Sequence, residues 1–127
     1  MLIRIPSTTD VVRVAAQVFP DDVTQQSELV TVWLPQQADE SLVNYVATHK
    51  KKIQGWIVGM LTDGYLNIQM FQAETPEVLA SLWKKVVQTY EIETAQLMTT
   101  DPETLKVLQF EPLYMTMEYR AKGSDQS

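Results

Sequence analysis

Apolar and mixed side chains alternate along the segment that follows Asp63 and Gly64, and this is the clearest structural pattern in the chain. The apolar members of the segment are spaced two residues apart, at Leu66, Ile68 and Met70. A period of two is that of a β-strand with one apolar and one mixed face. Because Asp-Gly suits the positive φ angles of a type I′ turn, the pattern predicts a hairpin of strands 53–62 and 65–72.

Apolar positions spaced three and four residues apart predict helices in other segments. The first helix begins within residues 7–10, which offer several side-chain oxygens as N-caps, and residues 19–22 end it. A later helix is capped by Thr75 and has Pro76 at its first position, where a proline is favourable. Asp101 caps a short helix that ends at residue 108.

Two segments in the first half of the chain give less regular patterns. Asp39 can cap a helix over residues 39–52, whose buried stripe is formed by Leu42, Val43, Val46 and Ala47. The positive residues His49 to Lys52 then complement the dipole at its carboxyl end. Residues 29–34 are β-branched and apolar and stop before a proline, so we predict a strand or an extended segment there, after a polar loop.

Three further apolar segments are predicted as strands, at 2–5, 94–100 and 113–120. Together these elements predict a mixed α+β domain, in which a largely antiparallel sheet is flanked by three longer helices and one short helix. A chain of 127 residues is long enough for one core. We therefore expect a single domain over residues 1–120 and a flexible tail over 121–127.

Composition excludes several classes of protein. Without cysteine, the chain has no disulfide and no thiolate nucleophile. Its formal charge of -6 opposes general nucleic-acid binding, which needs a basic face. No apolar run approaches the ~18 to 20 residues that span a bilayer. We expect a cytoplasmic protein with neither nucleic acid nor membrane as a partner.

The titratable residues have structural explanations as well as chemical ones. His49 is the only histidine, so no histidine-rich metal site is expected. Acidic pairs such as Asp39 and Glu40 fall at predicted caps and turns, where capping explains them without catalysis or metal binding. The positive cluster from His49 to Lys52 is explained by a solvated face, and its alternative role is contact with an anionic ligand.

The order of elements in the second half of the chain is typical of one family. A glycine-containing strand, Ile53–Met60, is followed by a strand, a helix, a strand, a short helix and a strand. This order resembles the GCN5-related N-acetyltransferase family, and residues 99–111 look like a shortened form of its late region. The resemblance implies that residues 66–71 form the strand whose splayed end receives acetyl-coenzyme A.

The residues at the implied cofactor position depart from the family pattern. The family binds the cofactor diphosphate on a Gln/Arg-x-x-Gly-x-Gly/Ala loop, whereas the run 72–80 contains no glycine and includes Pro76. No catalytic residue is identified, because the family's late tyrosine is absent from residues 103–108. The resemblance implies a ligand cleft at Phe71, Gln72, Ala73, Glu74 and Glu77.

These departures favour a non-classical N-acetyltransferase-like domain that has lost ordinary acetyl transfer and binds a small ligand or a protein, with no cofactor expected. The alternative is an active acyl-CoA-dependent N-acyltransferase with an atypical loop, which binds acetyl-CoA and uses Glu74 or a tyrosine as acid or base. A second alternative is a small acidic interaction module that forms a homodimer or binds a protein partner. Its candidate interface consists of Trp56, Tyr114, Met115 and Met117.

Overall fold

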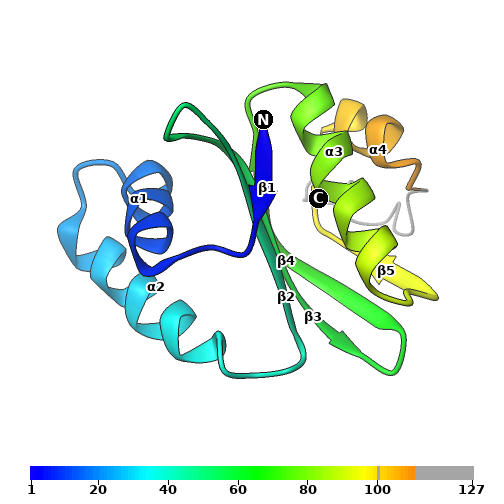
Figure 1. Ribbon diagram of the computed structural model, residues 1–127, viewed down its shortest axis with the longest axis horizontal. Helices are drawn as coiled ribbons and strands as arrows, with labels where there is room; N and C mark the ends of the chain where they lie inside the picture. Colours follow the sequence, from blue (N-terminus) through cyan, green and yellow to red (C-terminus); the bar gives the residue numbers. More distant parts are fainter. Residues whose placement is uncertain (100, 111–127) are drawn as a thin grey trace, which may run out of the picture.

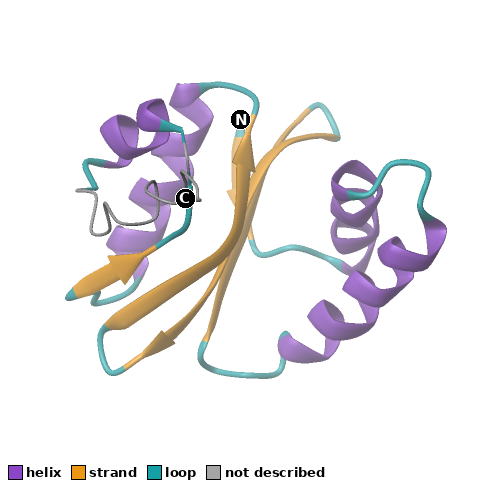
Figure 2. Ribbon diagram, turned by 180° about the vertical axis from the view of Figure 1, so that it is seen from behind, coloured by secondary structure: helices purple, strands orange, loops and turns teal. Residues whose placement is uncertain are grey.

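The computed structural model describes residues 1–99 and 101–110, and within them a five-stranded sheet separates two helical layers (Figures 1 and 2). The strands lie in sequence order as β1 (Leu2–Arg4), β2 (Leu42–His49), β3 (Lys52–Thr62), β4 (Tyr65–Ala73) and β5 (Thr94–Gln96). One face carries α1 (Thr8–Val18) and α2 (Val23–Gln36), and the other carries α3 (Pro76–Thr89) and α4 (Pro102–Leu108). The predicted α+β fold with a largely antiparallel sheet is confirmed.

The elements with the strongest local patterns form as predicted. Between β3 and β4, Asp63 and Gly64 have φ angles of 49° and 80°, as a type I′ turn requires. The side chains of Ser7, Thr75 and Asp101 cap α1, α3 and α4 by accepting hydrogen bonds from N–H groups of the first turn. Each cap satisfies one donor that the helix itself leaves unpaired.

The predicted strand at 29–34, with a polar loop before it, is wrong, because residues 23–36 form the helix α2. The side chain of Asp22 caps this helix by accepting from the N–H of Gln25 at 3.0 Å. Helical spacing then directs Val30, Trp33 and Leu34 to the sheet. Packing of this stripe overrides the weak strand preference of its β-branched residues.

The predicted helix over 39–52 is also wrong, because residues 42–49 form the strand β2. Every residue from 42 to 48 is buried, since helices cover both faces of the sheet at this point. A strand buried on both faces has no polar alternation, so its apolar residues are also compatible with a helical stripe. Asp39 makes a turn by accepting from the N–H of Ser41 at 2.9 Å.

The final part of the chain is only partly described. The predicted strand 94–100 is confirmed over the three residues of β5, and residues 97–99 have no regular structure. Residue 100, the predicted strand 113–120 and the predicted tail 121–127 lie outside the described residues. None of the helices in the described part is long and apolar enough to cross a membrane.

A β-bulge in β4 changes which side chains face each helical layer. Val58 pairs with Met70 and the next residue of β3 pairs with Ile68, so Gln69 is an extra residue. Before the bulge, Leu66 and Ile68 belong to the core beneath α3. After it, Phe71 faces that core and Met70 packs on the opposite side. The predicted common face of Leu66, Ile68 and Met70 is therefore wrong for Met70.

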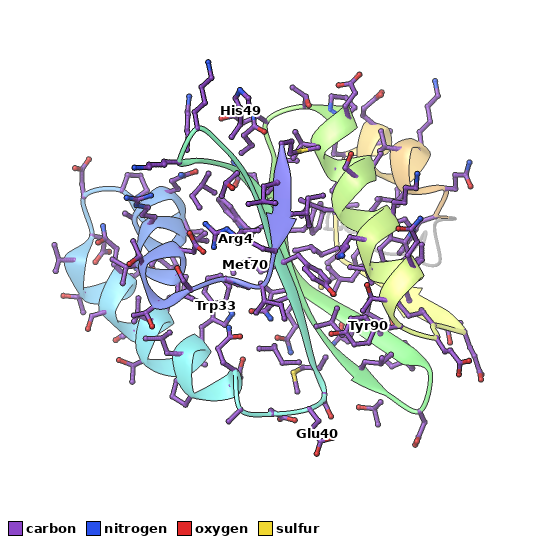
Figure 3. All side chains as sticks on the ribbon, viewed as in Figure 1. Arg4, Trp33, Glu40, His49, Met70 and Tyr90 are labelled. Atoms are coloured by element: carbon purple, nitrogen blue, oxygen red, sulfur yellow. The ribbon has the colours of Figure 1, made fainter. Side chains whose placement is uncertain are left out.

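The sheet has a separate core on each face. The core beneath α3 includes Leu82 and Val86, and the core beneath α1 and α2 includes Val11, Trp33 and Trp56. Figure 3 shows Trp33 and Tyr90 on opposite sides of the sheet. Trp56 is only 2% exposed, so its ring is covered by helices of its own chain.

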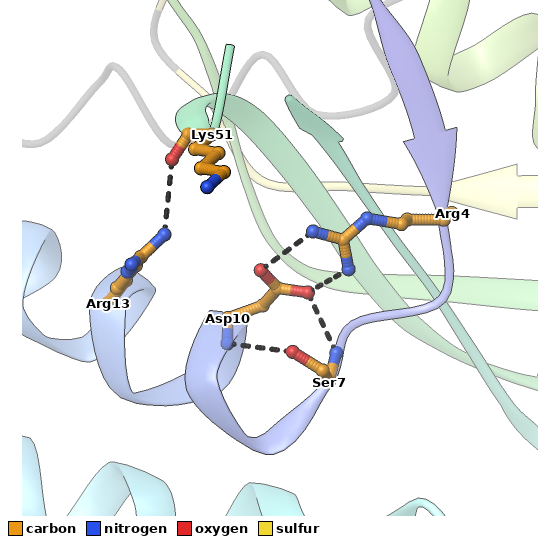
Figure 4. Close-up of polar contacts among 5 residues, drawn as sticks. All are labelled: Arg4, Ser7, Asp10, Arg13 and Lys51. Carbon is orange, nitrogen blue, oxygen red and sulfur yellow. Dashed lines mark hydrogen bonds and ion pairs between the residues drawn. The ribbon is translucent and has the colours of Figure 1, made fainter. Parts of the chain in front are cut away.

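An ion pair between Arg4 and Asp10 joins β1 to α1 (Figure 4). Asp10 is 2% exposed, and its carboxylate also accepts from the N–H of Ser7 at 2.8 Å. Burial by itself raises the pKa of Asp10, but the hydrogen bonds from Arg4 and Ser7 and the charge of Arg4 outweigh this effect. The net pKa therefore lies below its usual value of 3.8.

The pair predicts a pH-dependent contribution to stability. Because the pKa of Asp10 is lower in the folded protein, its contribution is complete above the usual pKa and is lost as the pH falls through the folded value. Replacement of Asp10 by Asn should lower the free energy of unfolding by about 1 to 2 kcal/mol at pH 7. Urea unfolding at pH 7, 5 and 3 measures the difference in free energy of unfolding between the native chain and Asp10→Asn. This difference should become smaller at pH 3. Asp21→Asn, at an exposed position, is the control, and an equal loss in both variants would contradict the assignment.

Candidate functional site

A pocket of about 270 Å³ opens where β4 ends, between the start of α3 and the helix α4. Residues 71–76 supply one wall with Leu79, and α4 supplies the other through Thr104 and Val107. Asp101 and Glu103 lie at the start of α4 on the same lining. The pocket is therefore formed by one strand end and two helices that pack against each other.

The pocket lies beyond the point where β4 loses its second neighbour. β5 pairs with β4 only through three residues, the last pair being Asn67 with Gln96. From Ile68 to Ala73, the edge of β4 away from β3 has no strand partner among the described residues. The two strands thus separate toward the end of β4 at which the pocket opens, and the free edge presents backbone N–H and C=O groups.

The lining combines an apolar base with polar groups that differ in availability. Thr75 already accepts from the N–H of Val78 at 3.2 Å, and Asp101 accepts from the N–H of Glu103 and the hydroxyl of Thr104 at 3.1 and 3.0 Å. The remaining polar side chains of the lining are Gln72, Glu74 and Glu103. Apolar contact surface comes from Phe71, Ala73, Pro76, Leu79 and Val107.

Glu74 is held at the end of β4 by a backbone contact and a charge contact. Its N–H donates to the carbonyl of Gln54 at 2.9 Å, which extends the pairing of β3 and β4 by one bond. Its carboxylate lies 3.8 Å from the Nζ atom of Lys52. Both side chains are substantially exposed, at 76% for Lys52 and 44% for Glu74. Such a pair is weak and is exchanged easily for other ligands.

The structure brings four of the five cleft residues proposed from the sequence to this pocket. Phe71, Gln72, Ala73 and Glu74 line it, whereas Glu77 lies on the first turn of α3 and is not part of the lining. The contribution of α4 was missed. The sequence indicates that helix through its cap, but its packing against α3 depends on long-range contacts that no local pattern encodes.

Of the four residues proposed for an interface, only Trp56 lies in the described part of the chain. Trp56 is buried beneath α1 and α2, so its side chain is not available to a partner. Tyr114, Met115 and Met117 lie outside the described residues. The indole N–H of Trp56 has no hydrogen-bond partner among the described groups, so the ring contributes packing to the core.

Other titratable groups lie away from the pocket. Burial, followed by the neighbouring Tyr45, raises the pKa of Tyr90 above its usual value, so its phenol is neutral at physiological pH. Tyr90 packs against the core beneath α3 at the opposite end of that helix from the pocket. No cluster of three metal-ligating side chains occurs in the part of the chain that the structure describes.

Gly55 on β3 permits the close approach that shapes this end of the sheet. A Cβ atom at this position would lie 2.7 Å from the carbonyl oxygen of Gln72 and 3.0 Å from both the Cα atom of Ala73 and a methyl group of Val78. Two of these neighbours are backbone atoms, which move only with the strand. Gly55 therefore fixes the distance between β3, the end of β4 and the start of α3.

Replacement of Gly55 by Ala should displace the end of β4 and destabilise the protein by about 1 to 3 kcal/mol, because an extra methyl group overfills this contact. Denaturant unfolding measures the loss. Thr62→Ala, at an exposed position on the same strand, is the control and should change stability by less than about 0.5 kcal/mol. Equal stabilities of the Gly55 variant and the native chain would show that the contact is not constrained.

Comparison of the sequence with known proteins gives no match, either to a protein-family model or to a curated protein. Comparison of the structure gives matches over nearly the whole chain. A predicted acetyltransferase with acetyl-CoA from Clostridium acetobutylicum is 13% identical, with a TM-score of 0.63 and coverage of 94% of this chain and 99% of that one. Aminoglycoside N-acetyltransferase AAC(6')-Iy in complex with CoA is 12% identical, with a TM-score of 0.65 and coverage of 95% and 94%.

A third structure, the acetyltransferase of the GNAT family from Streptococcus pneumoniae, is 12% identical, with a TM-score of 0.61 and coverage of 85% of this chain and 81% of that one. At these identities the likeness is one of fold. The chain has the fold of the GCN5-related N-acetyltransferases, as the order of its strands and helices implies.

Proposed function

We propose that the chain is an acyl-CoA-dependent N-acyltransferase, which transfers an acyl group from coenzyme A to an amine. The observation that carries this proposal is the separation of β5 from β4 beside a pocket at the end of β4. An unpaired strand edge hydrogen-bonds an extended, amide-containing ligand as another strand would. The pantetheine arm of coenzyme A is such a ligand.

The fold supports the same chemistry. Structural neighbours of this chain include one protein solved with acetyl-CoA and another solved with CoA. In the proposed reaction, the amine nitrogen attacks the thioester carbonyl carbon and the carbon–sulfur bond breaks. The products are an amide and a free thiol, and the proton that the amine loses ends on the thiolate. This proposal replaces the expectation of a domain without a cofactor, which the comparisons do not support.

The pocket places limits on how the cofactor would be held. The strand edge offers backbone groups to the pantetheine arm, while Phe71 and Leu79 offer apolar surface beside it. Glu74 is the acidic candidate for accepting the amine proton, since it lies on the pocket lining at the end of β4. A general base must reach the amine within hydrogen-bond distance, so a bound amine tests this role directly.

A second candidate function is the binding of a small ligand or a protein without acyl transfer. The observation that favours it is the shortage of N–H donors at the start of α3, where Pro76 has no N–H and the N–H of Val78 is taken by Thr75. Glu74 and Glu77 add negative charge at the same end. These features weaken diphosphate binding by backbone groups.

Calorimetric titration with acetyl-CoA, followed by acyl-transfer assays with a panel of amines, separates the two functions. The enzyme should show saturable binding in the range of roughly 1 μM to 1 mM, and thiol release that depends on the amine. Because the chain contains no cysteine, a thiol reagent reports only the released coenzyme A. Saturable binding without transfer favours the second candidate, and no binding rejects the enzyme.

A pocket-filling substitution places the binding site. Replacement of Val107 by Trp should abolish acetyl-CoA binding, because the larger side chain projects from α4 into a pocket of about 270 Å³. Val87→Trp makes the same chemical change on α3 at a position that is 45% exposed, and it should leave binding unchanged. Circular dichroism checks that both variants fold. Equal binding by both would place the ligand elsewhere.

A further inference from the structure

The turn between β2 and β3 carries positive charge to the same end of the sheet as the connection from β4 to α3 (Figures 1 and 3). This turn contains His49 and three lysines, of which Lys50 and Lys51 have positive φ angles of 51° and 67°. Arg13 of α1 donates to the carbonyl of Lys51 at 3.1 Å (Figure 4), which ties the turn to the helical layer. The turn is thus held in a defined position.

Backbone pairing brings Lys52 of this turn to the rim of the pocket. Lys52 is the first residue of β3, and the carbonyl of Gln54, two residues further along, accepts from the N–H of Glu74. The Nζ atom of Lys52 accordingly lies 3.8 Å from the carboxylate of Glu74, which is a lining residue. This is the only salt bridge between a lining residue and a cation within residues 1–99 and 101–110.

Among the described residues, the lining has no positive charge to offer a phosphate. Its charged side chains are all carboxylates, at Glu74, Asp101 and Glu103. The start of α3 supplies few backbone donors, because Pro76 has no N–H and the N–H of Val78 is taken by Thr75. A coenzyme A molecule carries a diphosphate and a further phosphate group, so a cation beside the lining would strengthen its binding at this site.

We propose that Lys52 is the phosphate-binding residue of this site, and that it exchanges its contact with Glu74 for a contact with a coenzyme A phosphate. The inference rests on the proposed function, since it names the group that holds the cofactor of that reaction. An exposed lysine–carboxylate pair is weak, so the free-energy cost of breaking it is small. The diphosphate as a whole and the terminal phosphate of coenzyme A each carry more negative charge than one carboxylate, and their oxygens accept charge-assisted hydrogen bonds.

The exchange also gives Glu74 a role in phosphate binding in place of the role of base, because the pantetheine arm separates the phosphates of coenzyme A from its thioester. While Lys52 contacts Glu74, the carboxylate neutralises the lysine and competes with phosphate for it. Once the cofactor is bound, Glu74 is released from the pair at the edge of the pocket. Removal of the Glu74 carboxylate should therefore strengthen phosphate binding, because Lys52 loses a competing partner and the phosphate loses a repelling charge.

Calorimetric titrations of the full chain with acetyl-CoA and with S-acetylpantetheine, which lacks phosphate groups, test the assignment. Lys52→Ala should weaken acetyl-CoA binding roughly tenfold and leave S-acetylpantetheine binding unchanged, because only a charge-assisted contact to phosphate is lost. Glu74→Gln should strengthen acetyl-CoA binding several-fold, as estimated for an exposed charge. Lys84→Ala removes the same charge from an exposed position on α3 and is the control, with less than about a twofold effect.

The salt dependence of affinity gives an independent measurement. Acetyl-CoA binding by the native chain should weaken as the salt concentration rises, and Lys52→Ala should reduce this slope. If Lys52→Ala leaves the affinity for both ligands unchanged, or lowers both affinities equally, Lys52 does not bind phosphate. In either case, saturable acetyl-CoA binding by the native chain would still support the proposed function. If the native chain binds no acetyl-CoA, the proposed function and this assignment both fail.

Discussion

The pairing of β4 is the constraint on which the rest of the structure depends. β4 pairs with β3 along almost the whole length of β4, whereas only the first three residues of β4 pair with β5. The remaining edge of β4 faces no other described strand, and the chain turns into α3 just beyond it. The opening, the pocket and the position of Glu74 all follow from this unequal pairing.

Local sequence patterns were sufficient where one residue determines the backbone. Asp63 and Gly64 determine a turn, and Thr75 and Asp101 determine where two helices begin, because each supplies a specific φ angle or acceptor. The end of β4 and the cap at Thr75 are separated by one residue, so predicting both also predicts where this wall of the pocket lies. Four of the five proposed cleft residues accordingly line the pocket.

The patterns failed where tertiary packing chooses between two locally acceptable structures. Residues 42–48 are buried because both faces of β2 are covered, and the apolar residues of the segment also fit a helical stripe. α2 contains β-branched residues, but the hydrogen bond from Trp33 to Asn44 at 3.0 Å and the packing of its stripe stabilise it as a helix. The contribution of α4 to the pocket was inaccessible for the same reason, because it depends on contacts with α3.

The bulge at Gln69 has a consequence for how this sequence can diverge. If Gln69 paired regularly instead of forming the bulge, the rest of β4 would be rotated by half a turn, which would direct Phe71 away from α3 and Met70 toward it. Substitutions that keep side-chain volume leave the register intact. Insertion or deletion of a regularly paired residue of β4 would exchange the two faces in the same way, so the strand tolerates changes of identity better than such changes of length.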